Sequence, residues 1–163
     1  MELKKIHPMQ VLCFETKTKL SEIGEYVRVV AHKMYRVAVQ NDLEITGPVY
    51  WIYDGMDGNP ETVFSLTIAL PISFKEKDLE NSEFKLKSLM AFQCVSQQHV
   101  GDWGKLGETY GSLIPTILSG GLTMSGENRE IYLNMISKTP KPTSQKFKLA
   151  LLSTDILCLT ATT

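Results

Sequence analysis

A diverged internal repeat constrains the fold of this chain more than any other feature of its sequence. The segment GPVYWIYDGM, which begins at Gly47, aligns with GENREIYLNM, which begins at Gly126. Two matches lie upstream in the same order: LSEIGEYV with WGKLGETY, and MQVLCF with MAFQCV. Each match is weak alone, but all three share nearly one offset, of about 80 residues, which indicates two similar halves.

Each half has the pattern strand, helix, strand, strand. The first half predicts a strand over 9–19, a helix of about five turns capped by Ser21, and strands over 49–53 and 61–72. The second half predicts a strand within 84–98, a helix that Asp102 caps and Gly120-Gly121 ends, and strands over 127–133 and 147–152. Pro115 lies inside that second helix and predicts a kink or an early end.

These elements predict an α+β fold of duplicated β-α-β-β halves, over about 8–74 and 84–152. We expect a pseudo-two-fold axis between the halves and a ligand cleft along it. One domain then spans 1–163, and the tail 153–163 is left without an assignment.

Composition excludes several classes of protein. The chain is 43% hydrophobic and 21% charged, which is typical of a folded globular protein rather than a disordered one. A formal net charge of −1 offers no basic field for direct binding of nucleic acid. Three cysteines without a CxxC motif, and the lack of an apolar signal segment or membrane span, predict a cytoplasmic protein with reduced thiols and no membrane contact.

Glu130 is the residue that points most directly to chemistry. It lies in the predicted strand segment REIYL, where side chains alternate between two faces. If Ile52 and Ile131 pack under the helices, the other face of the two matched strands gathers Trp51, Tyr53, Glu130 and Tyr132. Aromatic rings attract a cation and a carboxylate supplies the opposing charge, so this set predicts a cationic, partly apolar ligand. The alternative is a solvated Glu130 beside ordinary core aromatics.

Four segments together resemble the GyrI-like small-molecule-binding domain, which is also the effector-binding domain of AraC- and MerR-type bacterial regulators. They are GPVYWIYDGM, ETVFSLTIALPI, HVGDWGKLGETYGSLIPTILSGGL and REIYLNM, within a resemblance that covers roughly 8–152. The resemblance implies a duplicated β-α-β-β fold with Glu130 as the acid that faces the ligand. It places Trp51, Tyr53, Trp103, Tyr110 and Tyr132 around that acid.

The resemblance implies a standalone sensor or regulator that binds small molecules, including multidrug-type cations, in bacterial transcription regulation. The sequence departs from the family at Gly101-Asp102-Trp103, where Gly-Pro-Tyr is common, and in the lysine-rich segment SKTPKPTSQKF. No helix-turn-helix precedes the first predicted strand, so we expect no DNA-binding module in this chain.

Two other functions stay open. A hydrolase of reactive small molecules would use Glu130 as general base toward water, with Tyr110 or Tyr132 orienting the substrate. A protein-interaction inhibitor of a topoisomerase-like partner would need no ligand. Because the sequence shows no second catalytic group, we rank binding above catalysis. The histidines and cysteines have no metal-ligand spacing, so neither a metal nor a cofactor is expected; His99 is interpreted as a turn residue.

Overall fold

The structure is a computed structural model that describes residues 3–26, 29–74, 79, 82–134 and 145–151. Its centre is one antiparallel eight-stranded sheet with the strand order β1-β6-β8-β7-β3-β4-β2-β5. The strands are β1 (Leu3–Ile6), β2 (Met9–Thr18), β3 (Tyr50–Asp54), β4 (Phe64–Ile72), β5 (Lys85–Leu89), β6 (Phe92–Gly101), β7 (Glu127–Asn134) and β8 (Gln145–Leu151).

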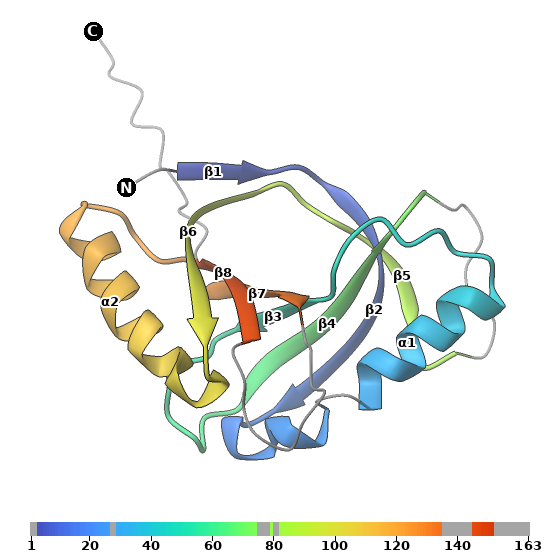
Figure 1. Cartoon of the computed structure of the whole chain (residues 1–163), viewed down its shortest axis with the longest axis horizontal. Helices are drawn as coiled ribbons and strands as arrows, with labels where there is room; N and C mark the ends of the chain where they lie inside the picture. The colour runs from blue at the N-terminus through green and yellow to red at the C-terminus, as the bar shows by residue number, and fades with distance from the viewer. Residues whose placement is uncertain (1–2, 27–28, 75–78, 80–81, 135–144, 152–163) are drawn as a thin grey trace, which may run out of the picture.

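Two α-helices pack on this sheet. Helix α1 (Val29–Gln40) contacts β2 and β4, and helix α2 (Leu106–Ser119) contacts β6. Figure 1 shows the helices at opposite ends of the molecule, with β3, β4 and β7 between them. Short 3-10 helices cover Leu20–Glu25 and Trp103–Lys105. The predicted α+β class is therefore confirmed.

The first predicted helix is wrong over its first turns. Residues 20–25 form a 3-10 helix instead, and α1 begins only at Val29. Ser21 does not cap a helix, because its backbone N–H and its hydroxyl both donate to the Pro60 carbonyl, at 3.3 and 3.2 Å. This contact anchors the segment to the loop between β3 and β4, which overrides the helical spacing.

The second half differs from the prediction in two places. The segment 84–98 was predicted to hold one strand, but it contains β5 and the start of β6, which pair with β2 and with β1 and β8. Helix α2 continues past Pro115 to Ser119 and ends at Gly120-Gly121 as predicted, with Gly121 at a φ of 72°. Leu113 and Ile117 are buried on either side of the proline, and this packing offsets the lost backbone hydrogen bond, which costs about 3 kcal/mol.

The core fills both faces of the sheet. On one face, Met34 and Ala38 of α1 pack against Leu12, Leu66 and Ile68, which are fully buried. The opposite face of β2, β3 and β4 buries Val11, Cys13, Ile52 and Ala69. Within the described residues, no helix is long and apolar enough to cross a membrane.

Candidate functional site

The site is centred on the pairing of β3 with β7, where the segments that begin at Gly47 and Gly126 lie side by side. Trp51 is opposite Glu130 in the register, and Tyr53 is opposite Asn128. Since side chains alternate along each strand, Trp51, Tyr53, Glu130 and Tyr132 occupy one face. The prediction that these four residues share a face is confirmed. The prediction that this face points away from the helices is wrong.

The face that carries Glu130 is the one that the helices cover. Trp51 and Tyr53 belong to the core cluster of α1, whereas Ile52 and Ile131 pack on the opposite side, near Cys13 and Cys94 respectively. The alternation of side chains along a strand predicts which residues share a face, but it does not predict which face meets the helices. The large aromatic rings fill the space between the helices and the sheet, and the smaller isoleucines lie on the opposite face of the sheet.

Glu130 is a buried acid held by three phenol groups. Glu130 is only 6% exposed. One of its carboxylate oxygens, Oε2, accepts hydrogen bonds from Tyr53 Oη at 2.9 Å and from Tyr132 Oη. The other oxygen, Oε1, accepts from Tyr110 Oη at 2.6 Å. Tyr110 comes from α2, Tyr53 from β3 and Tyr132 from β7, so three elements converge on one carboxylate.

No basic side chain in the described ranges forms an ion pair with Glu130. Burial raises the pKa of the Glu130 carboxyl, and the three phenol hydrogen bonds act in the opposite direction. The pKa of each of the three tyrosines is well above 10, first because the rings are buried and then because Glu130 is negatively charged. The phenols therefore stay protonated and act as donors.

Aromatic rings extend the site beyond the carboxylate. Trp51 meets Tyr132 edge to face, with ring centroids 5.9 Å apart at an interplanar angle of 68°. Tyr53 packs on Phe64 at 5.7 Å. Trp51 and Tyr53 are buried, whereas Tyr110 and Tyr132 are half-buried. The side of the cluster formed by Tyr110 and Tyr132 is thus the one nearest to solvent.

Comparison with known proteins was made by sequence and by structure. No family model matches the chain, and no curated protein matches it significantly in sequence. The EcmrR C-terminal domain has a TM-score of 0.72 at 16% identity, over 93% of this chain and 94% of that one. SAV2435, solved bound to tetraphenylphosphonium, has a TM-score of 0.57 at 10% identity, over 92% of each chain.

The chain has the GyrI-like fold. Two further structures share it. The EcmrR chain in a complex with DNA gives a TM-score of 0.75 at 15% identity, with 94% of this chain covering 56% of that one, so this chain spans little more than half of that protein. A hydrolase encoded by lin2189 from Listeria innocua gives 0.62 at 17% identity, over 93% and 91%. At these identities the likeness shows the fold alone.

Within this GyrI-like fold, the structure brings together five of the six residues predicted for the site: Glu130, Trp51, Tyr53, Tyr110 and Tyr132. The side chain of Trp103 lies outside the described part, as does the tail 153–163. Whether these residues bind a ligand stays a prediction. Sequence reasoning missed Phe64, which lies in the apolar strand β4 with nothing to distinguish it from the core.

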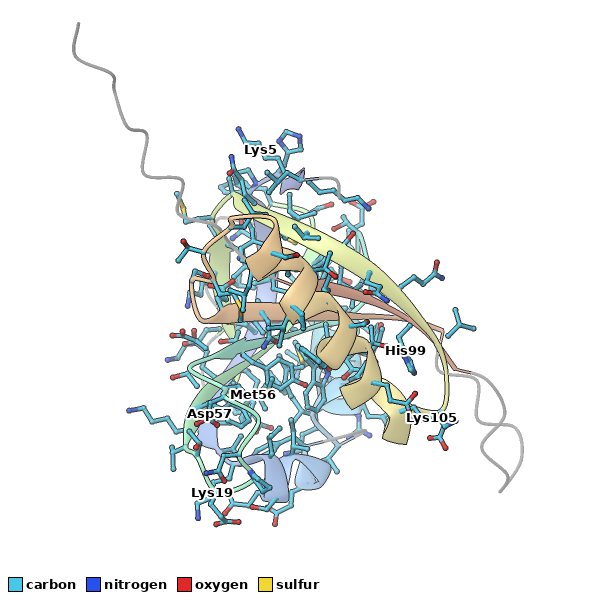
Figure 2. The ribbon with its side chains drawn as sticks, turned by 90° about the vertical axis from the view of Figure 1, so that its left-hand side faces the viewer. Lys5, Lys19, Met56, Asp57, His99 and Lys105 are labelled. Atoms are coloured by element: carbon cyan, nitrogen blue, oxygen red, sulfur yellow. The ribbon has the colours of Figure 1, made fainter. Side chains whose placement is uncertain are left out.

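His99 lies in strand β6, not in a turn as had been expected, and its contacts are structural. Its Nδ1 lies 2.7 Å from Thr109 Oγ1 and its Nε2 lies 3.0 Å from the Asp102 carbonyl oxygen, so it ties the end of β6 to the start of α2. Figure 2 shows His99 and Lys105 near that end of α2. Among the described residues, no group of three or more histidine, cysteine or acidic side chains is arranged to hold a metal ion.

Proposed function

We propose that this chain is the small-molecule-binding domain of a sensor or regulator, and that Glu130 binds the positive charge of a lipophilic or aromatic cation. The observation that carries the proposal is that the carboxylate of Glu130, a residue only 6% exposed, has three phenol donors and no cationic partner within the part of the chain that the structure describes. A buried charge is costly unless it is paired. A cationic ligand would supply the missing charge.

The Glu130 carboxylate has an acceptor position that its phenol partners do not use. An ionised carboxylate has about four acceptor positions, of which the phenols use three. A cation about 4 Å from the carboxylate would gain about 4 kcal/mol at the effective dielectric of a protein surface. The rings of Tyr110, Tyr132 and Trp51 would add about 0.5–2 kcal/mol for each face that the cation meets.

We propose that the ligand enters on the side of Tyr110 and Tyr132. These two rings are half-buried, while Trp51 and Tyr53 are buried behind them. Tyr110 packs in the cluster under α2 and Tyr132 packs against the α1 core, so rotation of Tyr110 would open a path to the carboxylate without disturbing that core. Tetraphenylphosphonium, the compound bound in the SAV2435 structure, is the natural first probe because it combines one positive charge with four aromatic rings.

We further propose that the two halves arose by duplication and that the pseudo-two-fold axis lies between β3 and β7. The order β6-β8-β7 on one side of that seam and β3-β4-β2 on the other supports this, since each matched strand takes the matched place. The seam then coincides with the Glu130 site. Regulation of transcription through a separate DNA-binding chain or domain, as the EcmrR–DNA complex suggests, is part of the same proposal.

The test is titration of tetraphenylphosphonium into wild type, Glu130→Gln and Glu108→Gln, followed by calorimetry and by tryptophan fluorescence. Glu108 is an exposed acid on α2, so its variant matches the change in net charge without touching the site. We expect Glu130→Gln to weaken binding at least tenfold, about 1.4 kcal/mol, and Glu108→Gln to leave it unchanged. Equal affinities for all three proteins, with the Gln variants folded, would refute the role of Glu130.

A hydrolase is the second candidate, because burial raises the pKa of Glu130 toward the range of a general base and one protein of this fold is described as a hydrolase. Turnover of an ester or epoxide that disappears in Glu130→Gln would favour it. Recovery of the probe unchanged after long incubation would favour binding. Inhibition of a topoisomerase-like partner stays a prediction from the resemblance.

A further inference from the structure

A second pocket lies on the opposite face of the sheet from Glu130. It has a volume of about 360 Å³, within the range of small-molecule sites, and strands β2, β3, β4, β5 and β7 contribute to its lining. Arg129 lines it, and because Arg129 is adjacent to Glu130 in β7, the two side chains leave the strand on opposite faces. The pocket is therefore separate from the site described above.

Arg129 is the unusual member of this pocket. It is 5% exposed, its Nε donates to Glu127 Oε1 at 2.7 Å, and its guanidinium carbon lies 3.9 Å from the centre of the Phe92 ring. Its Nη1 is buried and has no hydrogen-bond partner among the described residues. A buried guanidinium N–H without an acceptor costs about 1–3 kcal/mol or more. An acceptor from outside the protein would remove that cost.

The pocket also presents an acid without a described partner. Asp54 is exposed and makes no side-chain hydrogen bond or ion pair within the described residues, whereas Glu15 is paired with Lys87 at 2.5 Å and Glu127 is paired with Arg129. Asp54 is opposite Glu127 in the register, and Arg129 is opposite Ile52. Asp54 and Arg129 are thus diagonal neighbours, about 7–8 Å apart at the backbone.

Charge decides which class of ligand suits this arrangement. The lining holds three carboxylates, of Glu15, Asp54 and Glu127, against two cations, of Lys87 and Arg129. A simple anion would meet net negative charge, and a simple cation would leave Arg129 Nη1 without an acceptor. A molecule that carries a positive and a negative charge a few bonds apart would pair with Asp54 and Arg129 at the same time.

We propose that this pocket binds a small zwitterion of the α-amino-acid type with an apolar side chain. The carboxylate accepts from Arg129 Nη1, and the ammonium group donates to Asp54. Ile52 and Leu89, both buried, and Met90 supply an apolar wall for the side chain. Access to the buried Nη1 needs a movement of the lining, and the proposal assigns that movement to Met90, which is 75% exposed and has a side-chain type with three rotatable bonds.

The test uses three matched probes with the full chain: L-leucine, N-acetyl-L-leucine, which lacks the ammonium charge, and L-leucinamide, which lacks the carboxylate. We expect L-leucine to bind with a Kd of about 1 mM or tighter, and each analogue to bind at least tenfold more weakly. Equal binding of the three probes, or no binding of L-leucine, would overturn the proposal.

Variants separate this site from the Glu130 site. Asp54→Asn should reduce L-leucine binding at least tenfold, and Arg129→Lys, which keeps the charge but removes the fork of donors, should do the same. Asp42→Asn serves as the control, because Asp42 lies after α1 at a φ of 50°, which asparagine also adopts. Glu130→Gln should leave L-leucine binding unchanged. An unchanged affinity in a folded Asp54→Asn protein would contradict the proposal.

Discussion

The hydrogen bond from Tyr110 to Glu130 allows the sharpest test of the buried carboxylate. Tyr110→Phe removes one hydroxyl, 2.6 Å from Glu130 Oε1, and keeps the ring. A hydrogen bond to a charged acceptor contributes about 1.5–3 kcal/mol, and one between neutral groups contributes about 0.5–1.5 kcal/mol. The loss of stability should therefore depend on the protonation state of Glu130.

The direction of that pH dependence follows from the pKa of Glu130. Burial raises this pKa above the ordinary carboxyl value of 4.5, so the folded protein binds the proton more tightly than the unfolded chain does. The stabilising contribution of protonation is complete below 4.5 and is lost as the pH rises through the folded-state value. We expect Tyr110→Phe to cost about 1.5–3 kcal/mol at pH values above the titration of Glu130 in the folded protein, where the carboxyl is charged, and about 0.5–1.5 kcal/mol at pH values below it.

These differences are measured by urea unfolding at one pH below and one pH above the titration of Glu130. The proteins compared are wild type, Tyr110→Phe, Glu130→Gln and the double variant. In the Glu130→Gln background, Tyr110→Phe should cost about 0.5–1.5 kcal/mol at either pH, since no carboxylate remains. The same cost at both pH values in the wild-type background, or a full cost in the Glu130→Gln background, would refute a charged hydrogen bond at this position.

Three further predictions concern the fold. Met34→Ala, in the fully buried centre of the α1 core, should lower the free energy of unfolding by about 2–5 kcal/mol in urea titrations, whereas Val39→Ala, 72% exposed on the same helix, should change it by less than about 0.5 kcal/mol; a comparable loss at both sites would contradict the packing described. Gly121→Ala should lower the free energy of unfolding by about 1–2 kcal/mol, because Gly121 has a φ of 72°. Gly111→Ala, inside α2 with open space at the Cβ position, should raise it by about 0.4–1 kcal/mol. Thermal unfolding that gives the same sign for both variants would count against the assigned end of α2. Burial raises the pKa of the Cys13 thiol to about 11, so with Cys94 replaced by alanine and Cys158 by serine a thiol reagent at neutral pH should label Cys13 only after denaturant is added. Rapid labelling of the native protein would show that this face is open.

Much of the strand arrangement around the site was predictable, because two short segments of similar sequence carry it. The alternation of REIYL predicted that Glu130 and Tyr132 share a face, and β3 and β7 place Trp51 opposite Glu130. The same alternation has no information on which face the helices cover. That depends on the volume of the opposing side chains, and here the aromatic rings, rather than Ile52 and Ile131, fill the space below the helices.

The contacts of Glu130 were less predictable than its neighbours. Tyr53, Tyr110 and Tyr132 were expected as ring walls, but each points its hydroxyl at the carboxylate. Tyr110 comes from another element, so only the tertiary arrangement sets its direction. β5, whose sequence KLKSL lacks β-branched residues, was likewise not visible as a separate strand, because its pairing with β2 determines its conformation.

The most direct measurement of the central claim is a crystal structure of this chain with tetraphenylphosphonium. The account predicts the phosphorus atom near the Glu130 carboxylate, with at least one of the rings of Tyr110, Tyr132 and Trp51 within about 6 Å of the positive centre, and Tyr110 or Tyr132 rotated to admit it. A cation bound on another surface, with the three phenols still closed over Glu130, would contradict it.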